Sequence, residues 1–365
     1  MLKLIRNCLA SKGTLIDGDN NIINWLYIIK LVQLQEKKGL HLGTKIRKRH
    51  IMWQQEKMKV ALAAQTLSLS VGNALIFCRK TLKYPEFLES AATSRFCIYI
   101  NNIFDLLNSR NLFCKTSTKQ CITRENLDNI KIQVNDFITY LSSLRDQQGS
   151  ILNSSRKTGF LGMIICLKSM IGIAEMLFED NCFKFLMTYK LSQDHLETFF
   201  SAIRSRGGFN NNPTAWEFKT ALKQLMAKAD IRILHNANCH ILDDTKLVMS
   251  DKVLEGQSEE ILDETNLFLQ EHNYCINFEI NLSEYAYEVI MYIAGFVSKS
   301  IAKHLQCEHC KKYLTDTKIL SKLQILKCRG ALTNASPDVI EICITTEKIL
   351  KTNTNELTKK MQFLY

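Results

Sequence analysis

Proline is scarce in this sequence and glycine is not abundant. The 365 residues contain only three prolines and 14 glycines. This composition excludes a turn-rich β sandwich, a collagen-like chain and a low-complexity chain. The hydrophobic fraction of 46% is enough for a sizeable core divided among two or three units. We therefore predict a mainly α fold.

Long uninterrupted apolar runs are also missing. The most apolar stretch, Gly159 to Phe178, is interrupted by Lys168 and Glu175. It predicts a buried helix, with no membrane span and no membrane partner. The 13 cysteines show no repeated spacing, and no signal peptide is recognised ahead of them. We expect reduced thiols in the cytosol or nucleus.

Basic residues outnumber acidic ones, which gives a net charge of +11 and favours a polyanionic partner. The densest basic cluster consists of Lys45, Arg47, Lys48, Arg49 and His50. Two interpretations stand for this basic cluster. It contacts DNA phosphates or acts as a nuclear localisation signal, or it is a solvated loop beside a helix.

The most informative stretch runs from Lys190 to Leu225. Ser192 is predicted to cap a helix that has Asp194 in its first turn. The pair Gly207-Gly208 predicts the end of that helix. Thr214 and Glu217 then have the spacing of a capping box, which predicts a second helix. The positions predicted to face a core are Leu196, Phe199, Phe200, Ile203, Trp216, Leu222 and Leu225.

Within this stretch, the string LSQDHLETFFSAIRSRGGFNNNPTAWEF resembles a motif of P-element-type transposases, a family that includes the THAP-domain group. The resemblance implies the C-terminal helices of an RNase H-like domain, resumed after a large helical insertion domain. It also implies DNA as the partner and an Asp, Asp, Glu triad that binds magnesium. Glu197 occupies the place of the triad Glu. Asp194, one turn earlier, would assist it or contact a ligand of the insertion domain.

The first residues, MLKLIRNC, resemble a family segment that directly follows the second triad Asp. We therefore expect both triad aspartates and the THAP zinc finger to be absent from this chain. Lys57 to Leu75 and Asn108-Ser109-Arg110 resemble the insertion domain, which makes GTP a candidate ligand by resemblance. The sequence contains no GxxxxGK[ST] phosphate loop, so no guanine or phosphate contacts are assigned.

The motifs and the shifts in composition predict five segments. Residues 241–281 are notably acidic, which is typical of a linker or a peripheral lobe. The predicted segments are the end of the first RNase H-like part (1–20), the insertion domain (21–185), the RNase H-like C-terminal segment (186–230), the acidic linker (231–283) and a C-terminal helical lobe (284–365).

The C-terminal lobe carries a CxxC pair, Cys307 and Cys310. Two thiolates at this spacing can bind one zinc ion, but no second CxxC supplies the other two ligands. Reduced structural thiols are the alternative. The pair follows Tyr292-Ile293-Ala294-Gly295, which is similar to a helix that precedes a CxxC in related transposases.

Two functional hypotheses follow. The first is a fragment or domesticated derivative of a DNA transposase, nuclear, able to form homo-oligomers and inactive alone because two triad aspartates are missing. The second is a non-catalytic DNA-binding or protein-interaction scaffold. Arg204 and Arg206 fit either hypothesis, because they could hold a DNA phosphate or simply end a helix as exposed side chains.

Overall fold

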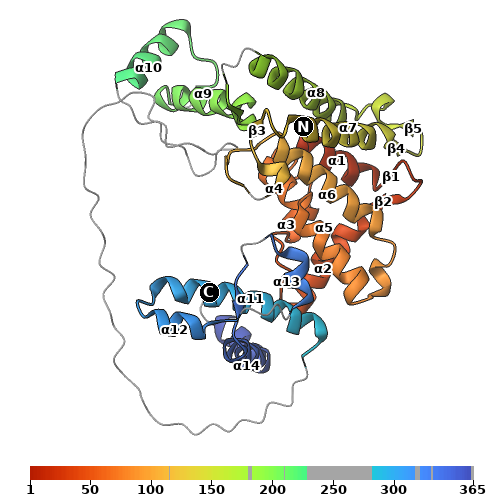
Figure 1. Cartoon of the computed structure of the whole chain (residues 1–365), viewed down its shortest axis with the longest axis vertical. Helices are drawn as coiled ribbons and strands as arrows, with labels where there is room; N and C mark the ends of the chain where they lie inside the picture. The colour runs from red at the N-terminus through yellow and green to blue at the C-terminus, as the bar shows by residue number, and fades with distance from the viewer. Residues whose placement is uncertain are drawn as a thin grey trace. The chain divides into compact units, whose positions relative to one another are not determined.

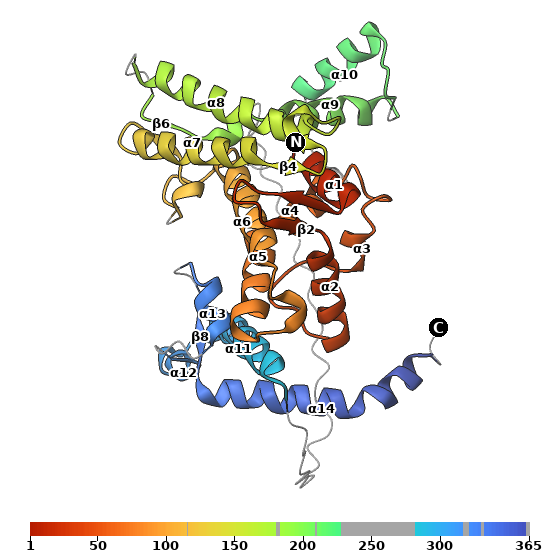
Figure 2. The same cartoon turned by 90° about the vertical axis from the view of Figure 1, so that its right-hand side faces the viewer.

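The computed structural model describes residues 1–114, 116–179, 183–208, 210–227, 282–316, 321–329 and 332–362. These residues are mainly helical, as predicted, and Figures 1 and 2 show the helices with their labels. They divide into two compact units, one formed by Met1–Leu191 with Ile280–Tyr365 and the other by Ser192–Glu279. The predicted acidic linker lies outside the described residues, apart from its last two positions.

The larger unit begins with helix α1 (Leu2–Lys12), and a small antiparallel sheet follows it directly. Its strand order is β2-β1-β4-β5, so strands from the start of the chain pair with strands more than 100 residues later. The strands are β1 (Thr14–Ile16), β2 (Ile22–Asn24), β4 (Arg145–Asp146) and β5 (Gly149–Ser150). The apolar spacing from Ile22 to Glu36 predicts a helix, and this prediction is wrong at its start, because pairing with β1 makes the first three residues a strand. Helix α2 begins at Leu26.

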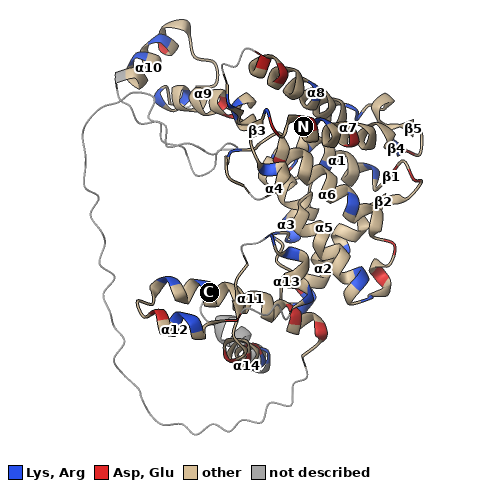
Figure 3. Cartoon of the chain, viewed as in Figure 1, with Lys and Arg blue, Asp and Glu red and all other residues tan. Residues whose placement is uncertain are grey.

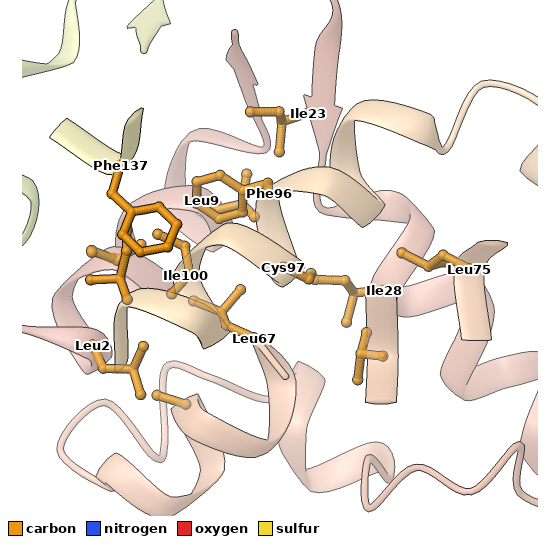
Figure 4. Packing of buried hydrophobic residues seen from close by; sticks show 14 of the residues in the cluster. Leu2, Leu9, Ile23, Ile28, Leu67, Leu75, Phe96, Cys97, Ile100 and Phe137 are labelled. Carbon is orange, nitrogen blue, oxygen red and sulfur yellow. The ribbon is translucent and has the colours of Figure 1, made fainter. Parts of the chain in front are cut away.

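Most of the larger unit consists of helices around one apolar core. They are α2 (Leu26–Lys38), α3 (Lys48–Ile51), α4 (Val60–Thr66), α5 (Leu69–Ile76), α6 (Ala91–Leu106), α7 (Leu127–Ser143) and α8 (Thr158–Glu179). Figure 4 shows part of the core, including Leu9, Phe96 and Phe137 from three different helices. Two short strands, β3 (Ile122–Thr123) and β6 (Phe185–Leu186), pair antiparallel.

The apolar spacing of Lys57 to Leu75 predicts one helix, but the structure divides it into α4 and α5. The break lies at Leu67 and Ser68, where the Ser68 hydroxyl accepts a hydrogen bond from the Val71 amide at 3.3 Å and caps α5. Helix α5 then packs closely on α6. A Cβ at Gly72 would lie 2.7 Å from the Ile98 side chain, so only glycine permits this approach.

Among the described residues, two helical stretches are long and apolar enough to cross a membrane, namely Val60–Thr81 and Thr158–Glu179. Such stretches are weak evidence, because core helices of soluble proteins have the same length and composition. Both stretches contribute buried side chains to the core, for example Leu75 and Leu167.

The C-terminal lobe belongs to the same compact unit as the first 191 residues. Its elements are α11 (Glu284–His304), α12 (Glu308–Tyr313), β7 (Thr315–Asp316), α13 (Lys322–Lys327), β8 (Asn334–Ala335) and α14 (Pro337–Gln362). The Tyr285 hydroxyl donates to the Leu40 carbonyl at 2.6 Å, and the Asn73 side chain donates to the Leu326 carbonyl at 2.8 Å. These bonds join α11 and α13 to segments more than 200 residues earlier in the chain.

The smaller unit contains two described helices, α9 (Asp194–Arg206) and α10 (Ala215–Ala227). Its buried apolar cluster is small. Four buried side chains form it, namely Ala202, Ile203, Ala221 and Leu225.

Candidate metal and nucleic-acid sites

Helix α9 carries both predicted acidic site residues in its first turn. Asp194 is its first residue and Glu197 follows three residues later. The N-cap is Gln193, not Ser192 as predicted, although the Ser192 hydroxyl does accept a hydrogen bond from the Asp194 amide at 3.4 Å. Both carboxylates therefore lie at the positive end of the helix dipole.

The end of α9 and the start of α10 follow the predictions from sequence. Helix α9 ends at Arg206 with Gly207 as its C-cap, and Gly208 has φ +64°, a conformation that favours glycine. The Thr214 amide donates to the Glu217 carboxylate at 2.7 Å, and the Glu217 amide donates to the Thr214 hydroxyl at 3.3 Å. The predicted capping box is therefore confirmed.

The apolar faces of α9 and α10 are only partly buried. Ile203 is 2% exposed, but Leu196 is 58% exposed and Phe200 47% exposed. Trp216, predicted to face a core, is 74% exposed. These predictions are wrong because two short helices bury only the residues along their mutual contact. Phe200 packs edge-on against the neighbouring Phe199 ring, with centroids 5.8 Å apart, but stays half-exposed.

Arg204 and Arg206 line a cavity of about 180 Å³ between the two helices, at the turn that joins them. Trp216 contributes to the same cavity. Two guanidinium groups beside an exposed indole ring combine phosphate binding with a surface on which a base can stack. Figure 3 shows the basic residues on α9 and α10.

The acidic residues near Glu197 do not form a complete magnesium site. Throughout the described residues, no group of three or more His, Cys, Asp or Glu side chains could hold a metal ion. Asp194 and Glu197 each already interact with other groups of the protein. Magnesium needs several oxygen ligands on rigid elements, so these two carboxylates alone do not fit a catalytic metal pair.

The basic cluster before α4 is exposed, but its end is fixed to the core. Arg49 pairs with Glu56, and its hydrogen bond holds the pKa of the Glu56 carboxyl below the ordinary value. His50 is buried and its ring nitrogen Nδ1 accepts a hydrogen bond from the Arg47 amide at 3.0 Å. Burial lowers the pKa of His50, so the ring is neutral at pH 7.

Lys45, Arg47 and Lys48 remain exposed to solvent. Their side chains form no ion pair with any other described residue, in contrast to Arg49. Three cations thus project from a segment that the buried His50 ring anchors. This arrangement suits phosphate contacts, which require accessible charge on a fixed backbone.

The zinc ligands predicted at Cys307 and Cys310 are both exposed. Cys307 immediately precedes α12, and its pKa is lowered because Cys310 donates hydrogen bonds to its sulfur. No third ligand joins them among the residues that the structure describes. The described cysteines carry free thiols.

Three family models match the chain in order along its length. They are "TNP-like, GTP-binding insertion domain" over residues 1–121, "TNP-like, RNase H C-terminal domain" over 189–223 and "DNA transposase THAP9, C-terminal domain" over 281–364. The chain belongs to the P-element-type transposase family.

The relatives of this P-element-type chain are transposases from human and fly. The human DNA transposase THAP9 is 26% identical over 391 residues, which is 100% of this chain and 42% of the relative. The Drosophila melanogaster transposable element P transposase is 28% identical over 309 residues, covering 82% of this chain and 39% of the relative. The chain thus spans less than half the length of these curated relatives.

A solved structure shares the fold of this family member. The Drosophila P element transposase strand transfer complex superposes with a TM-score of 0.53 and 27% identity, over 63% of this chain and 51% of the other. The mainly α prediction and the family resemblance are both confirmed.

Proposed function

We propose that this chain is a derivative of a P-element-type DNA transposase that binds DNA but cannot cut or join DNA strands by itself. The observation that carries the proposal is that the acidic residues in the first turn of α9, Asp194 and Glu197, belong to no larger group of metal-binding side chains among the described residues. Glu197 stands where the family's third metal ligand belongs, yet no three-carboxylate group exists among the described residues.

The chemistry explains why one carboxylate is not enough. Strand cleavage and joining need an activated water or 3′ hydroxyl and a stabilised leaving oxygen, and two magnesium ions supply both functions. One ligand on α9 contributes to such a pair only when two further carboxylates face it. We therefore propose that Glu197 is retained from a catalytic ancestor and that its metal site is incomplete among the residues that the structure describes.

The first experiment is a cleavage and strand-transfer assay on the purified chain, with magnesium or manganese and transposon-end DNA. We expect no product, and Glu197→Gln should behave like the wild type. Strand transfer that disappears in Glu197→Gln would overturn the proposed inactivity.

DNA binding is supported by the exposed basic residues. We propose that the basic cluster contacts phosphates through Lys45, Arg47 and Lys48, with Arg49 held by Glu56. We propose a second contact at Arg204 and Arg206, beside the exposed Trp216. Each phosphate contact that is lost should reduce the salt slope of duplex binding by about 0.9.

The second experiment measures duplex binding against salt concentration. The triple variant K45Q/R47Q/K48Q should reduce the slope of log K against log salt by about 2.7. The control K37Q/K80Q/K168Q removes the same charge from exposed positions elsewhere. Equal effects of the two variants would show that only net charge matters, and the assignment to the basic cluster would fail.

The family match also supports cofactor and location proposals. We propose GTP with magnesium as a ligand of the insertion domain, because the matching model carries that name. Zinc at Cys307 and Cys310, a nuclear location and the domain limits at residues 20, 185, 230 and 283 remain proposals of the same kind.

A second candidate function is a non-catalytic protein-interaction scaffold. The exposed apolar side chains of Leu196 and Phe200 favour it, because such a surface suits a homo-oligomer contact. Sedimentation of the wild type and of L196E/F200E tests this candidate. An assembly that dissociates in the variant supports it, and a wild-type monomer counts against it.

A further inference from the structure

A groove of about 530 Å³ runs along the outer face of α11 in the C-terminal lobe. Phe296, Lys299 and Lys303 line it along the helix, and Leu332 and Thr333 line the opposite side. The lining residues that the structure describes include two lysines and no carboxylate. The groove therefore combines an apolar floor with positive charge.

Helix geometry places these side chains on one face. Phe296, Lys299 and Lys303 follow one another at spacings of three and four residues, and the two lysines are separated by about 6 Å along the helix axis. The opposite face of α11 is packed inside the lobe, where Ala294 and Ser298 are fully buried. Phe296, which the apolar spacing predicts to be packed, is instead 73% exposed.

The wall of the groove is held close to the helix at Gly295. A Cβ at this position would lie 2.1 Å from the Thr333 carbonyl oxygen, so only glycine allows the segment to pack so tightly. This contact fixes the backbone of the groove wall against α11.

One end of the groove adjoins the segment that leads into the basic cluster. Lys327 donates from Nζ to the Gly43 carbonyl at 3.3 Å, and the same Nζ lies 5.8 Å from the ring centroid of Tyr292, a residue that lines the groove. A Cβ at Gly43 would lie 2.9 Å from the Tyr292 ring. The exposed Lys45 follows two residues later. The backbone that leads into the exposed basic cluster therefore contacts residues at one end of the groove.

We infer that the α11 groove binds unpaired nucleotides of a DNA strand. Lys299 and Lys303 contact successive phosphates, and a base stacks on Phe296. An acidic peptide with apolar side chains is the other ligand that fits this lining. Continuity with an exposed basic cluster favours the nucleic acid, because a strand can extend across both surfaces. The inference rests on the proposed DNA-binding function and adds the single-stranded form of the ligand.

The test uses the full chain and fluorescence anisotropy with a labelled 20-nucleotide oligothymidine and a duplex of the same length. F296A should weaken single-strand binding at least about fivefold, because a base loses its stacking surface. K299A/K303A should reduce the single-strand salt slope by about 1.4. Both variants should leave duplex binding within about twofold of the wild type.

Controls separate the groove from general charge and from misfolding. K312A/K322A removes two exposed lysines of the same lobe that do not line the groove. It should reduce the salt slope of oligothymidine binding less than K299A/K303A does. Circular dichroism should show unchanged folding in F296A, because the side chain is mostly exposed.

Three results would overturn the inference. The first is unchanged oligothymidine binding in both groove variants. The second is an equal loss of single-strand and duplex binding. The third uses a labelled peptide of alternating Glu and Phe as a further probe, and it is a loss of peptide binding in the groove variants while oligothymidine binding is unchanged. Duplex binding by the wild type tests the proposed function separately. It can therefore succeed when the groove inference fails.

Discussion

At the residue scale, Lys327 shows how the fold changes the chemistry of a side chain. Burial against Tyr292 and the Gly43 carbonyl, together with the positive charge of the nearby Arg329, lowers the pKa of its ammonium to about 8. An unfolded lysine has a pKa of about 10.4. The unfolded chain therefore binds more protons than the folded chain between these two values.

The consequence is a specific pH dependence. Because the unfolded state holds the extra proton, Lys327 makes the folded state more stable as pH rises from about 8 to about 10.4. In K327M this contribution should disappear. The measurement is the free energy of unfolding by urea at several pH values, for both proteins. Parallel curves for wild type and K327M would show that Lys327 keeps an ordinary pKa in the folded chain.

Also at the residue scale, several of the cysteines are buried as thiols in the core. Burial raises the pKa of Cys97 to about 12 and that of Cys8 to about 11. A neutral buried thiol behaves as a small apolar side chain and is a poor nucleophile. These cysteines therefore serve packing, in contrast to the exposed pair at Cys307 and Cys310.

At the element scale, α10 depends on its capping box because little of the helix is buried. Thr214 and Glu217 satisfy each other's backbone amides at the start of the helix. Thr214→Ala should destabilise α10 by about 1 kcal/mol, since the Glu217 amide loses its acceptor.

Hydrogen exchange of the α10 amides is the measurement for this capping effect. T214A should increase the exchange rates there without changing those of α6. Thr214→Ser keeps the hydroxyl and serves as the matched control. Equal exchange in T214A and T214S would mean that the cap contributes nothing to helix stability.

Element boundaries show where local sequence patterns are sufficient. Caps and glycines act within four residues, so Gly207 and the Thr214 box could be located from sequence alone. Strand β2 could not be located in this way. Its residues also have helical apolar spacing, and pairing with strand β1 is what makes them a strand. Apolar periodicity identifies a face, but it does not show whether another element covers that face, as Trp216 illustrates.

At the scale of the whole molecule, the C-terminal lobe shares one core with the first part of the chain. Tyr285 of α11 is fully buried and donates to the Leu40 carbonyl, whereas the described residues of the smaller unit contribute only four buried side chains to its apolar cluster. The lobe and the insertion-like helices should therefore unfold together. The smaller unit should open at lower free energy.

Hydrogen exchange resolved by peptide tests this cooperativity. Amides of α11 should exchange with the same free energy as those of α5, and amides of α9 should exchange faster. Tyr285→Phe should lower the protection of α11 and α5 together, while Tyr313→Phe, at an exposed ring, should change neither. Fast exchange of α11 alone would show that the lobe is an independent domain.

The sequence by itself determined the helical class, the family and the turn between α9 and α10, since these depend on local spacing and on an ordered motif. The tertiary structure decided which of the predicted positions are accessible. It buried His50 and left Lys45 exposed, and it placed Phe296 outside the core. It also brought Gly43 against Lys327, a contact between residues 284 positions apart. Burial and long-range contacts depend on which elements meet, and no local pattern contains that information.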